Sequence, residues 1–274
     1  MSVKLSRPLI AVLLFLAVAL ALAFNSYGLG RMAKAQSHYA LARSLFGIAA
    51  WMGDGRAQNN LAGLFAEGLG GPPDYQAAAK WFQEASNAGV VEAKFNLSNF
   101  YESGTGVPRD TGKAIALLEE AAAMGDVLAA FNAGKLLSED RSDSPKDIPR
   151  AIRWYRQSAD AGYASAQYNL GCIYAQGVGV PRDWSAAGAW FAKAAAQGHT
   201  KAQMDLGTML ASGTGDTHDF AQGISLLNKA AGDPKISTEV KRRYVAVCIA
   251  AREASDIEWC ASHGLSANSS KLPS

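Results

Sequence analysis

The side chains that most often carry out chemistry in proteins are few in this sequence, and they stand apart from one another. The four histidines are His38, His199, His218 and His263. The sequence contains neither His-Glu-x-x-His nor a pair of Cys-x-x-Cys motifs, so a metal site would have to be assembled from distant segments. We therefore predict no metal and no cofactor, and we interpret the histidines as solvent-exposed or turn residues.

Local signatures of a nucleophile are also missing. Neither Gly-x-Ser-x-Gly nor Ser-x-x-Lys occurs, which gives no support to a serine hydrolase. Glycine pairs at Gly104–Gly106 and Gly177–Gly179 could suggest phosphate binding, but a phosphate loop follows a strand and opens a helix. These glycines follow helical patterns and lead to proline, so we interpret them as helix ends. We predict no catalytic residue.

The positions of small residues show an internal repeat. Ala57, Ala93, Ala129, Ala166 and Ala202 are equivalent, with spacings of 36, 36, 37 and 36 residues. A fixed period of this length, with apolar residues at constant phases, is typical of proteins built from stacked structural repeats. We therefore expect one array rather than separate globular domains.

Each repeat has the pattern of a helix, a turn and a second helix. In the fourth, Ala166, Leu170, Ile173 and Tyr174 form one apolar helical face, which ends at the glycine–proline turn of residues 177–181. An aspartate that can cap the second helix follows the turn. This aspartate recurs as Asp74, Asp110, Asp147, Asp183 and Asp219.

This combination resembles the Sel1-like repeat, a relative of the tetratricopeptide repeat. The turn is intact as Gly-Thr-Gly-Val-Pro-Arg-Asp at residues 104–110 and again at residues 177–183, and Ala-x-x-Trp-Phe-x-x-Ala-Ala marks the second helix. The resemblance covers roughly residues 40–232. It implies an all-α fold, a right-handed solenoid of stacked helix-turn-helix Sel1-like repeats. The third repeat departs from it, with a charged turn at residues 138–145 that is one residue longer.

The period also predicts how the chain is divided. Five repeats are expected within residues 57–236, and a linker with an N-terminal capping helix within residues 24–56. Residues 237–265 should form C-terminal capping helices, and residues 266–274 a tail. The five repeats are expected at residues 57–92, 93–128, 129–165, 166–201 and 202–236.

The N-terminus has the composition of an export segment. Lys4 and Arg7 precede an apolar run of sixteen residues, Leu9–Phe24, which is shorter than a typical membrane span of about 20 residues. Ala21 and Ala23 offer a cleavage site after residue 23. A periplasmic or secreted protein and an uncleaved inner-membrane anchor with periplasmic repeats both fit, because the charges hold the N-terminus inside.

The charge balance and the cysteines limit the partners further. The 26 Lys and Arg nearly balance the 24 Asp and Glu, which argues against nucleic acid and gives no polybasic signal for a lipid surface. If the chain is exported, Cys248 and Cys260 could form a disulfide that holds the last helix to the final turn, leaving Cys172 unpaired. Buried unbridged cysteines are the alternative.

A polar series at one phase of the first helices is the best candidate for a binding site. First helices line the concave side of a stacked hairpin array, where amides can hold the backbone of an extended peptide and aromatic rings its side chains. Alternatively, each amide bonds a neighbouring helix end and sets the twist of the array. The candidate groove residues are Asn60, Phe95, Asn96, Asn99, Phe131, Asn132, Lys135, Tyr168, Asn169 and Asp205.

We therefore expect a non-catalytic scaffold or adaptor of the bacterial envelope, which binds a segment of a partner protein and regulates signalling or surface-polymer assembly. A glycan- or peptidoglycan-binding module using an exposed aromatic such as Trp184 is the alternative, followed by a hydrolase. Should the polar series be buried between helices, the partner surface would be sought at residues 139–146. A membrane partner is expected only through an uncleaved N-terminal segment.

Overall fold

All regular secondary structure in the described part of the chain is helical, which confirms the predicted all-α fold. One isolated β-bridge, between Arg141 and Ser144, is the other element found there. The expected leader within residues 1–23 and the expected tail within residues 266–274 lie outside the described residues. The computed structural model describes residues 25–141, 143–215, 217–235, 237–250 and 254–263.

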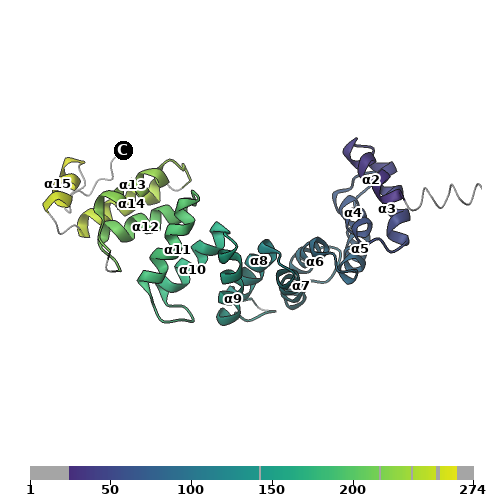
Figure 1. Ribbon diagram of the computed structural model, residues 1–274, viewed down its shortest axis with the longest axis horizontal. Coiled ribbons are helices and arrows are strands. Elements are labelled where there is room, and N and C mark those ends of the chain that lie inside the picture. The colour runs from purple at the N-terminus through teal and green to yellow at the C-terminus, as the bar shows by residue number, and fades with distance from the viewer. Residues whose placement is uncertain (1–24, 142, 216, 236, 251–253, 264–274) are drawn as a thin grey trace, which may run out of the picture. The chain divides into compact units, whose positions relative to one another are not determined.

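The chain forms two compact units, whose helices are labelled in Figure 1. Unit 1 contains residues up to 129 together with the loop residues 141–144, and unit 2 contains residues 130–140 and those from 145 onward. In unit 1, each helix packs against the next one along the chain. Its helices are α2 (Ser26–Ala35), α3 (Tyr39–Trp51), α4 (Gly55–Glu67), α5 (Tyr75–Asn87), α6 (Val91–Ser103) and α7 (Thr111–Ala123).

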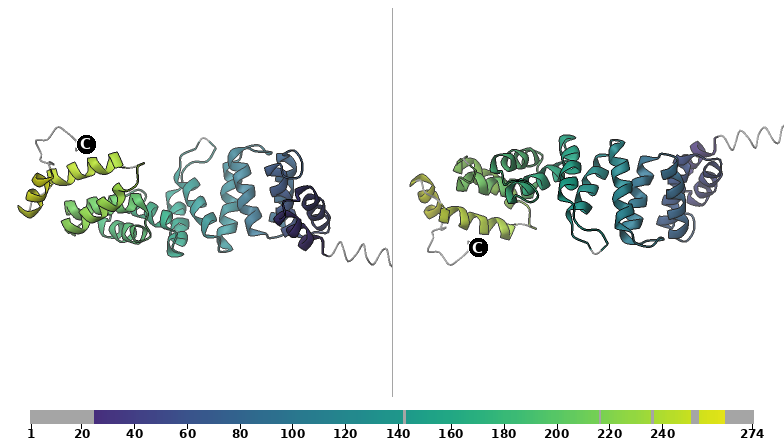
Figure 2. Two further views of the ribbon diagram at one scale, coloured as in Figure 1. Left: turned by 90° about the horizontal axis from the view of Figure 1, so that it is seen from above. Right: turned by 90° about the horizontal axis from the view of Figure 1, so that it is seen from below.

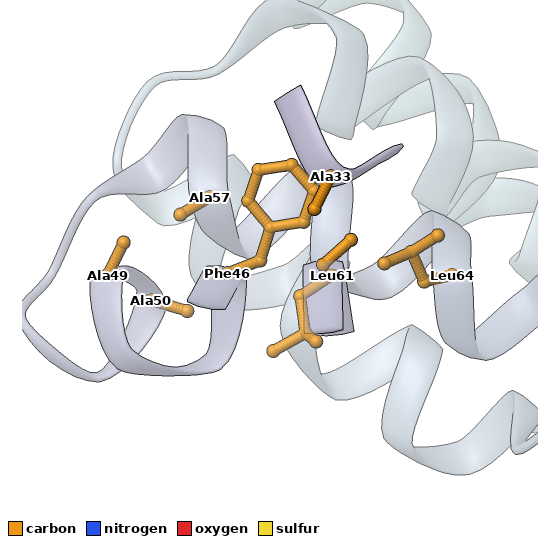
Figure 3. Close-up of a cluster of buried hydrophobic side chains, with 8 residues drawn as sticks. Ala33, Phe46, Ala49, Ala50, Ala57, Leu61 and Leu64 are labelled. Carbon is orange, nitrogen blue, oxygen red and sulfur yellow. The ribbon is translucent and has the colours of Figure 1, made fainter. Parts of the chain in front are cut away.

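Unit 1 begins with a helix pair where a linker and one capping helix were expected. Helix α2 occupies the segment assigned to the linker because its small residues pack closely on α3, with Gly30 directly against the Phe46 ring. Figure 3 shows Ala33 from α2, Phe46 from α3 and Leu61 from α4 in one buried cluster. The segment before the first repeat is therefore a folded hairpin.

Unit 2 continues the same succession of helices and adds two more at its end (Figure 2). Helix α14 packs against both α12 and α13, and α15 packs against α14. These are the predicted C-terminal helices. The helices of unit 2 are the remainder of α8 (Val127–Ser138), α9 (Ile148–Asp160), α10 (Ala164–Gln176), α11 (Trp184–Ala196), α12 (Thr200–Ser212), α13 (Phe220–Ala231), α14 (Ser237–Ala250) and α15 (Ala254–Ser262).

The predicted aspartate caps are confirmed in both units. Each carboxylate accepts a hydrogen bond from the backbone N–H three residues later, for example Asp74 from Ala77 at 2.9 Å and Asp183 from Ala186 at 2.9 Å. The cap satisfies one of the N–H groups that a helix start leaves without a partner. The remaining capped helices begin after Asp110, Asp147 and Asp219.

One large side chain per helix pair fills the space between the helices. This side chain lies at the same position in the second helix of each pair, and small alanines around it let the helices approach closely. The buried side chains at this phase are Phe46, Phe82, Leu118, Tyr155, Phe191 and Leu227.

The turn of the third repeat contacts its neighbour differently from the others. In the second repeat, Gly106 has a positive φ of 70° and lies against the backbone of Tyr75, the first residue of α5, where a Cβ would clash. The third repeat has no glycine there. Instead Asp143 accepts hydrogen bonds from the Thr111 hydroxyl at 2.6 Å and the Thr111 N–H at 3.3 Å, at the first residue of α7. A carboxylate–hydroxyl contact thus replaces a glycine–backbone contact.

Candidate functional site

The polar series on the first helices links consecutive repeats in the same way in both units. In unit 1, the Asn96 amide of α6 donates to the Asn59 side-chain oxygen of α4 at 3.2 Å. In unit 2, the Tyr168 hydroxyl of α10 donates to the Asp205 carboxylate of α12 at 3.1 Å. In each pair the two residues are 37 positions apart in the sequence, so the same step from one repeat to the next brings them together.

The predicted groove residues of unit 1 lie at the surface or are half-buried. The Asn60 amide donates to the Arg56 carbonyl of its own helix at 2.9 Å, and Asn96 bonds Asn59 as described. Asn99 is exposed and Phe95 is half-buried. The structure thus places two of these amides in contacts within the array, and a role in holding a peptide stays a prediction.

The predicted residues at the start of unit 2 surround an aromatic cluster. The Phe131 ring packs edge-on to Tyr163 at 5.0 Å between centroids, and against Tyr155 at 5.9 Å. Burial raises the pKa of Tyr155, whose hydroxyl is hydrogen-bonded to Ser138 at 3.1 Å and also to Asn169. Asn132 is half-buried, and Lys135 is exposed.

Tyr168 and Asp205 line a pocket of about 430 Å³ in unit 2, here called the Asp205 pocket. Its walls come from helices α10, α11, α12 and α14. The volume of the pocket is within the range of about 300–1,000 Å³ that is typical of ligand sites. The pocket contains an apolar wall and several polar groups that face the same space. The apolar wall is formed by Ala175, Trp184, Phe191 and Met209, and the polar groups belong to Tyr168, Cys172, Gln176, Asp205, Thr208, Ser212, Thr214 and Arg243.

Two oppositely charged side chains of this pocket, Asp205 of α12 and Arg243 of α14, form an ion pair. The Asp205 side chain is 19% exposed, and burial raises its pKa, while the Arg243 guanidinium at 3.5 Å acts in the opposite direction. The Arg243 Nε also donates to Glu239 at 3.1 Å, within α14. The guanidinium therefore compensates a buried carboxylate, and it is held in place from its own helix.

Burial further favours the neutral form of the tyrosine and the cysteine in the pocket. It raises the pKa of Tyr168, with the Asp205 charge as a second cause, and it raises the pKa of the Cys172 thiol. A thiol with a raised pKa is protonated at neutral pH and is a poor nucleophile. The pocket therefore offers hydrogen bonds and apolar contacts rather than a reactive group.

Two residues outside the predicted groove complete the site. His199 stacks on Tyr168 with 4.7 Å between ring centroids, and it caps α12 by accepting from the Ala202 N–H at 3.2 Å. Burial lowers the pKa of His199. Arg243 comes from a helix that the sequence suggested only as a cap. Arg243 follows Val240 by three residues and precedes Val247 by four, and both valines are buried. This spacing could have placed Arg243 at the edge of the packed face of α14.

The C-terminal helices that supply Arg243 are joined by a covalent bond. A disulfide links Cys248 of α14 to Cys260 of α15, and Cys172 is a free cysteine. His218, from the turn before α13, lies 3.3 Å from the buried Asp256 of α15. These contacts hold α15 on the end of unit 2.

Within the described residues, no group of three or more His, Cys, Asp or Glu side chains could hold a metal ion. None of the helices α2–α15 combines the length and the apolar character needed to cross a membrane.

The Sel1 repeat family model matches residues 55–90, 91–126, 127–163, 164–199 and 200–232. A solved protective antigen present in uropathogenic Escherichia coli strains, with an SLR fold, is similar at a TM-score of 0.74 and 25% identity, over 88% of this chain and 53% of that one. This chain thus spans about half the length of that antigen.

A Sel1 repeat protein from Oxalobacter formigenes is similar in fold. It matches at a TM-score of 0.64 and 24% identity, over 86% of this chain and 98% of that one. No curated protein matches this sequence.

Proposed function

This chain belongs to the Sel1 repeat family, whose members are generally protein-interaction scaffolds and typically non-catalytic, and from that premise we propose that it is a non-catalytic adaptor of the bacterial envelope. It binds a segment of a partner protein, and the Asp205 pocket of unit 2 is the centre of that contact. The pathway it regulates is one of signalling or of surface-polymer assembly.

One observation supports the pocket as the contact. A carboxylate that is only 19% exposed lies beside an apolar wall and is paired with an arginine from another helix. Such an arrangement gives a partner both an apolar cavity for a side chain and fixed hydrogen-bonding groups around it. Trp184 and Phe191 would hold an apolar or aromatic side chain, and Thr208 and Thr214 would bond its backbone.

Placement in the envelope is supported by the N-terminal sequence alone. Lys4 and Arg7 before the apolar run Leu9–Phe24 are typical of an export segment. N-terminal sequencing of the protein isolated from its native membranes and periplasm tests this proposal. A start near Phe24 would indicate cleavage, an intact N-terminus in the membrane fraction would indicate an anchor, and recovery only from the cytoplasm would contradict both.

The partner contact can be tested by photo-crosslinking in the native cell. A photoreactive amino acid replaces Gln176, which is exposed and lines the pocket. We expect a specific crosslinked protein that is lost in Trp184→Ala and in Arg243→Gln. Arg242→Gln is the matched control, because the Arg242 side chain is 69% exposed and does not line the pocket. Crosslinks that persist in Trp184→Ala and Arg243→Gln would exclude the pocket as the contact.

A glycan-binding function has one observation in its favour. Trp184 also lines a second pocket of about 580 Å³ in unit 2, together with Tyr174, Pro181 and Arg182. Aromatic faces beside an arginine can hold a sugar ring. Calorimetric titration with soluble peptidoglycan fragments tests this function. Binding that is lost in Trp184→Ala but retained in Arg243→Gln would favour the glycan over the protein partner.

A further inference from the structure

The first helix pair of unit 1 exposes an unusual amount of apolar surface. Five of the ten large apolar side chains that are exposed in the described part of the chain lie between residues 32 and 52. Trp51 is the most exposed of them, at 85%. The five side chains are Met32 of α2 and Leu41, Ile48, Trp51 and Met52 at or next to α3.

Four of these residues form one surface, here called the α3 outer face: Leu41, Ile48, Trp51 and Met52. Spacings of seven and four residues place Leu41, Ile48 and Met52 in one line along the helix, and Trp51 lies beside Ile48 at a spacing of three. The opposite side of α3 is packed against α2 and α4 through Phe46 and its neighbours (Figure 3). Helix α3 is therefore apolar on two sides, of which only one is buried.

The same face is polar or small in the later second helices, except for Met124, which follows α7 at the position of Met52 and is 52% exposed. The position of Ile48 is occupied by Glu84, Glu120, Gln157, Lys193 and Lys229. The position of Trp51 is occupied by Asn87, Ala123, Asp160 and Ala196. The repeat itself therefore does not require an apolar α3 outer face, and another contact must account for it.

In unit 2, the equivalent face of α13 borders the preceding second helix, α11. Gln222 and Lys229, at the positions of Leu41 and Ile48, line a shared pocket with Ala192 and Ala195 of α11. Helix α3 is the earliest second helix in the described part of the chain, so no second helix from that part precedes it. Within the described part of unit 1, its outer face therefore ends the stack.

The chain before this helix pair indicates what covers the face. The apolar run Leu9–Phe24 ends two residues before α2 begins, so there is almost no linker between them. No Asp or Glu occurs before Asp54, whereas Arg31 and Lys34 carry positive charge on α2. Cations, exposed apolar side chains and a tryptophan next to an apolar segment are typical of a helix at the surface of an anionic membrane.

We propose that the α3 outer face contacts the membrane surface, with Ile48 and Trp51 inserted among the headgroups of an anionic bilayer. The proposal rests on the envelope placement given above with the apolar N-terminal segment uncleaved, and it adds a second attachment to that segment. An apolar segment inserted in the bilayer holds a chain there by itself, so the second contact keeps the α3 outer face at the headgroups. The contact would also fix the orientation of unit 1 on the membrane.

Fluorescence quenching by lipids tests the contact in the full chain. The protein is reconstituted into vesicles of phosphatidylethanolamine and phosphatidylglycerol at about 3:1 with a trace of doxyl-labelled lipid, which quenches tryptophans at the membrane interface. Trp51 is one of six tryptophans, and Trp51→Phe removes the reporter while keeping an apolar side chain. The measured quantity is the tryptophan emission that the doxyl-labelled lipid removes. We expect this lost emission to be about threefold or more smaller in Trp51→Phe than in wild type, and unchanged in Trp190→Phe.

A second variant tests the face itself rather than the reporter. Ile48→Glu introduces the residue found at the equivalent position of α5 and α7, at a side chain that is 46% exposed, so we expect it to fold. It should also reduce the quenching of Trp51. Equal quenching in Trp51→Phe and Trp190→Phe, or unchanged quenching in Ile48→Glu, would overturn the proposal.

Two other outcomes are informative. A doubled mass in detergent that reverts to the monomer in Ile48→Glu, with Trp51 unquenched in vesicles, would overturn the membrane contact in favour of a second copy of the chain. The Gln176 crosslink reports the partner contact independently. Quenching that persists without that crosslink would remove the partner proposal and leave the membrane contact standing.

Discussion

At the scale of single residues, Arg243 governs the charge of the Asp205 pocket. Burial raises the pKa of Asp205, so the folded protein holds that proton more tightly than the unfolded chain, and lowering the pH through the folded pKa adds stability. Arg243 works against this effect at 3.5 Å. Without Arg243, a mostly buried carboxylate would be left without its positive partner at neutral pH.

We predict that Arg243→Gln lowers the free energy of unfolding at pH 7 by about 1 kcal/mol, a value reduced for the partial exposure of both side chains. Because the substitution raises the pKa of Asp205 further, the deficit should shrink as the pH falls from 7 toward 4. Urea unfolding at several pH values measures this. Arg242→Gln serves as the control, and an equal loss in both variants at every pH would contradict the role of Asp205.

Asp143 provides the opposite pH dependence. Hydrogen bonds from Thr111, first from its hydroxyl, lower the pKa of Asp143 below its ordinary value of 3.8. Its stabilising contribution is therefore complete above pH 3.8 and is lost as the pH falls below that value through the folded pKa. We predict that Asp143→Asn lowers the Tm at pH 7 and that the difference from wild type narrows in acid.

The matched control for Asp143 lies in the same loop. Asp140 is exposed and separated from Asp143 by only two residues, so Asp140→Asn changes the charge of the loop equally. Thermal unfolding of both variants at neutral and acidic pH compares a hydrogen-bonded carboxylate with one exposed to solvent. A Tm loss of equal size in both would attribute the effect to net charge.

The sequence could predict Tyr168 and Asp205 as partners because the repeat period places them on neighbouring first helices at adjacent phases. It could place Arg243 at the edge of the packed face of α14 but could not predict its contact with Asp205, because α14 lies outside the period and its packing against α12 depends on tertiary contacts. The same limit applies to His199. Its stacking on Tyr168 depends on how a turn meets the preceding repeat rather than on any spacing within one helix.

At the scale of elements, the turns decide how closely neighbouring repeats approach. Gly106 has a positive φ and lies against the Tyr75 backbone, so a side chain there meets both strain and a clash. We predict that Gly106→Ala lowers the free energy of unfolding by about 2 kcal/mol or more. Chemical denaturation measures the loss.

A second glycine separates the two causes. Gly125 also has a positive φ, of 95°, but an added Cβ would meet nothing within 4 Å. Gly125→Ala should therefore cost only the strain, about 1 kcal/mol. Equal losses in Gly106→Ala and Gly125→Ala would show that the approach to Tyr75 contributes nothing.

The elements also show which features of the fold could be read from the period. The aspartate caps and the glycine helix ends recur at fixed phases, so the second helices were predictable. Helix α2 was not, because it has no aspartate cap and lies before the first full repeat. The third-repeat turn was recognised as different, but its contact with Thr111 depends on a small first residue in α7, where α5, α9 and α11 begin with Tyr75, Ile148 and Trp184.

At the scale of the whole chain, stability in a repeat protein is a sum of local terms. Each repeat contacts only its neighbours, so a change in the last helices should weaken nearby repeats and leave distant ones unaffected. The Cys248–Cys260 disulfide is suited to test this because it closes a short loop between α14 and α15 at one end of unit 2. Arg243, on α14, connects that end to the Asp205 pocket.

We predict that reducing this disulfide lowers the stability of unit 2 by about 2–3 kcal/mol, the value expected for a loop of this length. Hydrogen exchange should then accelerate in α14 and α12, while α3 to α7 of unit 1 keep their protection. The double variant Cys248→Ala with Cys260→Ala is the control, since a reductant should change nothing in it. Because α14 supplies Arg243, reduction should also weaken the Gln176 crosslink. Equal acceleration in both units would mean that the chain unfolds as one cooperative body, and the partner contact would then depend on every repeat.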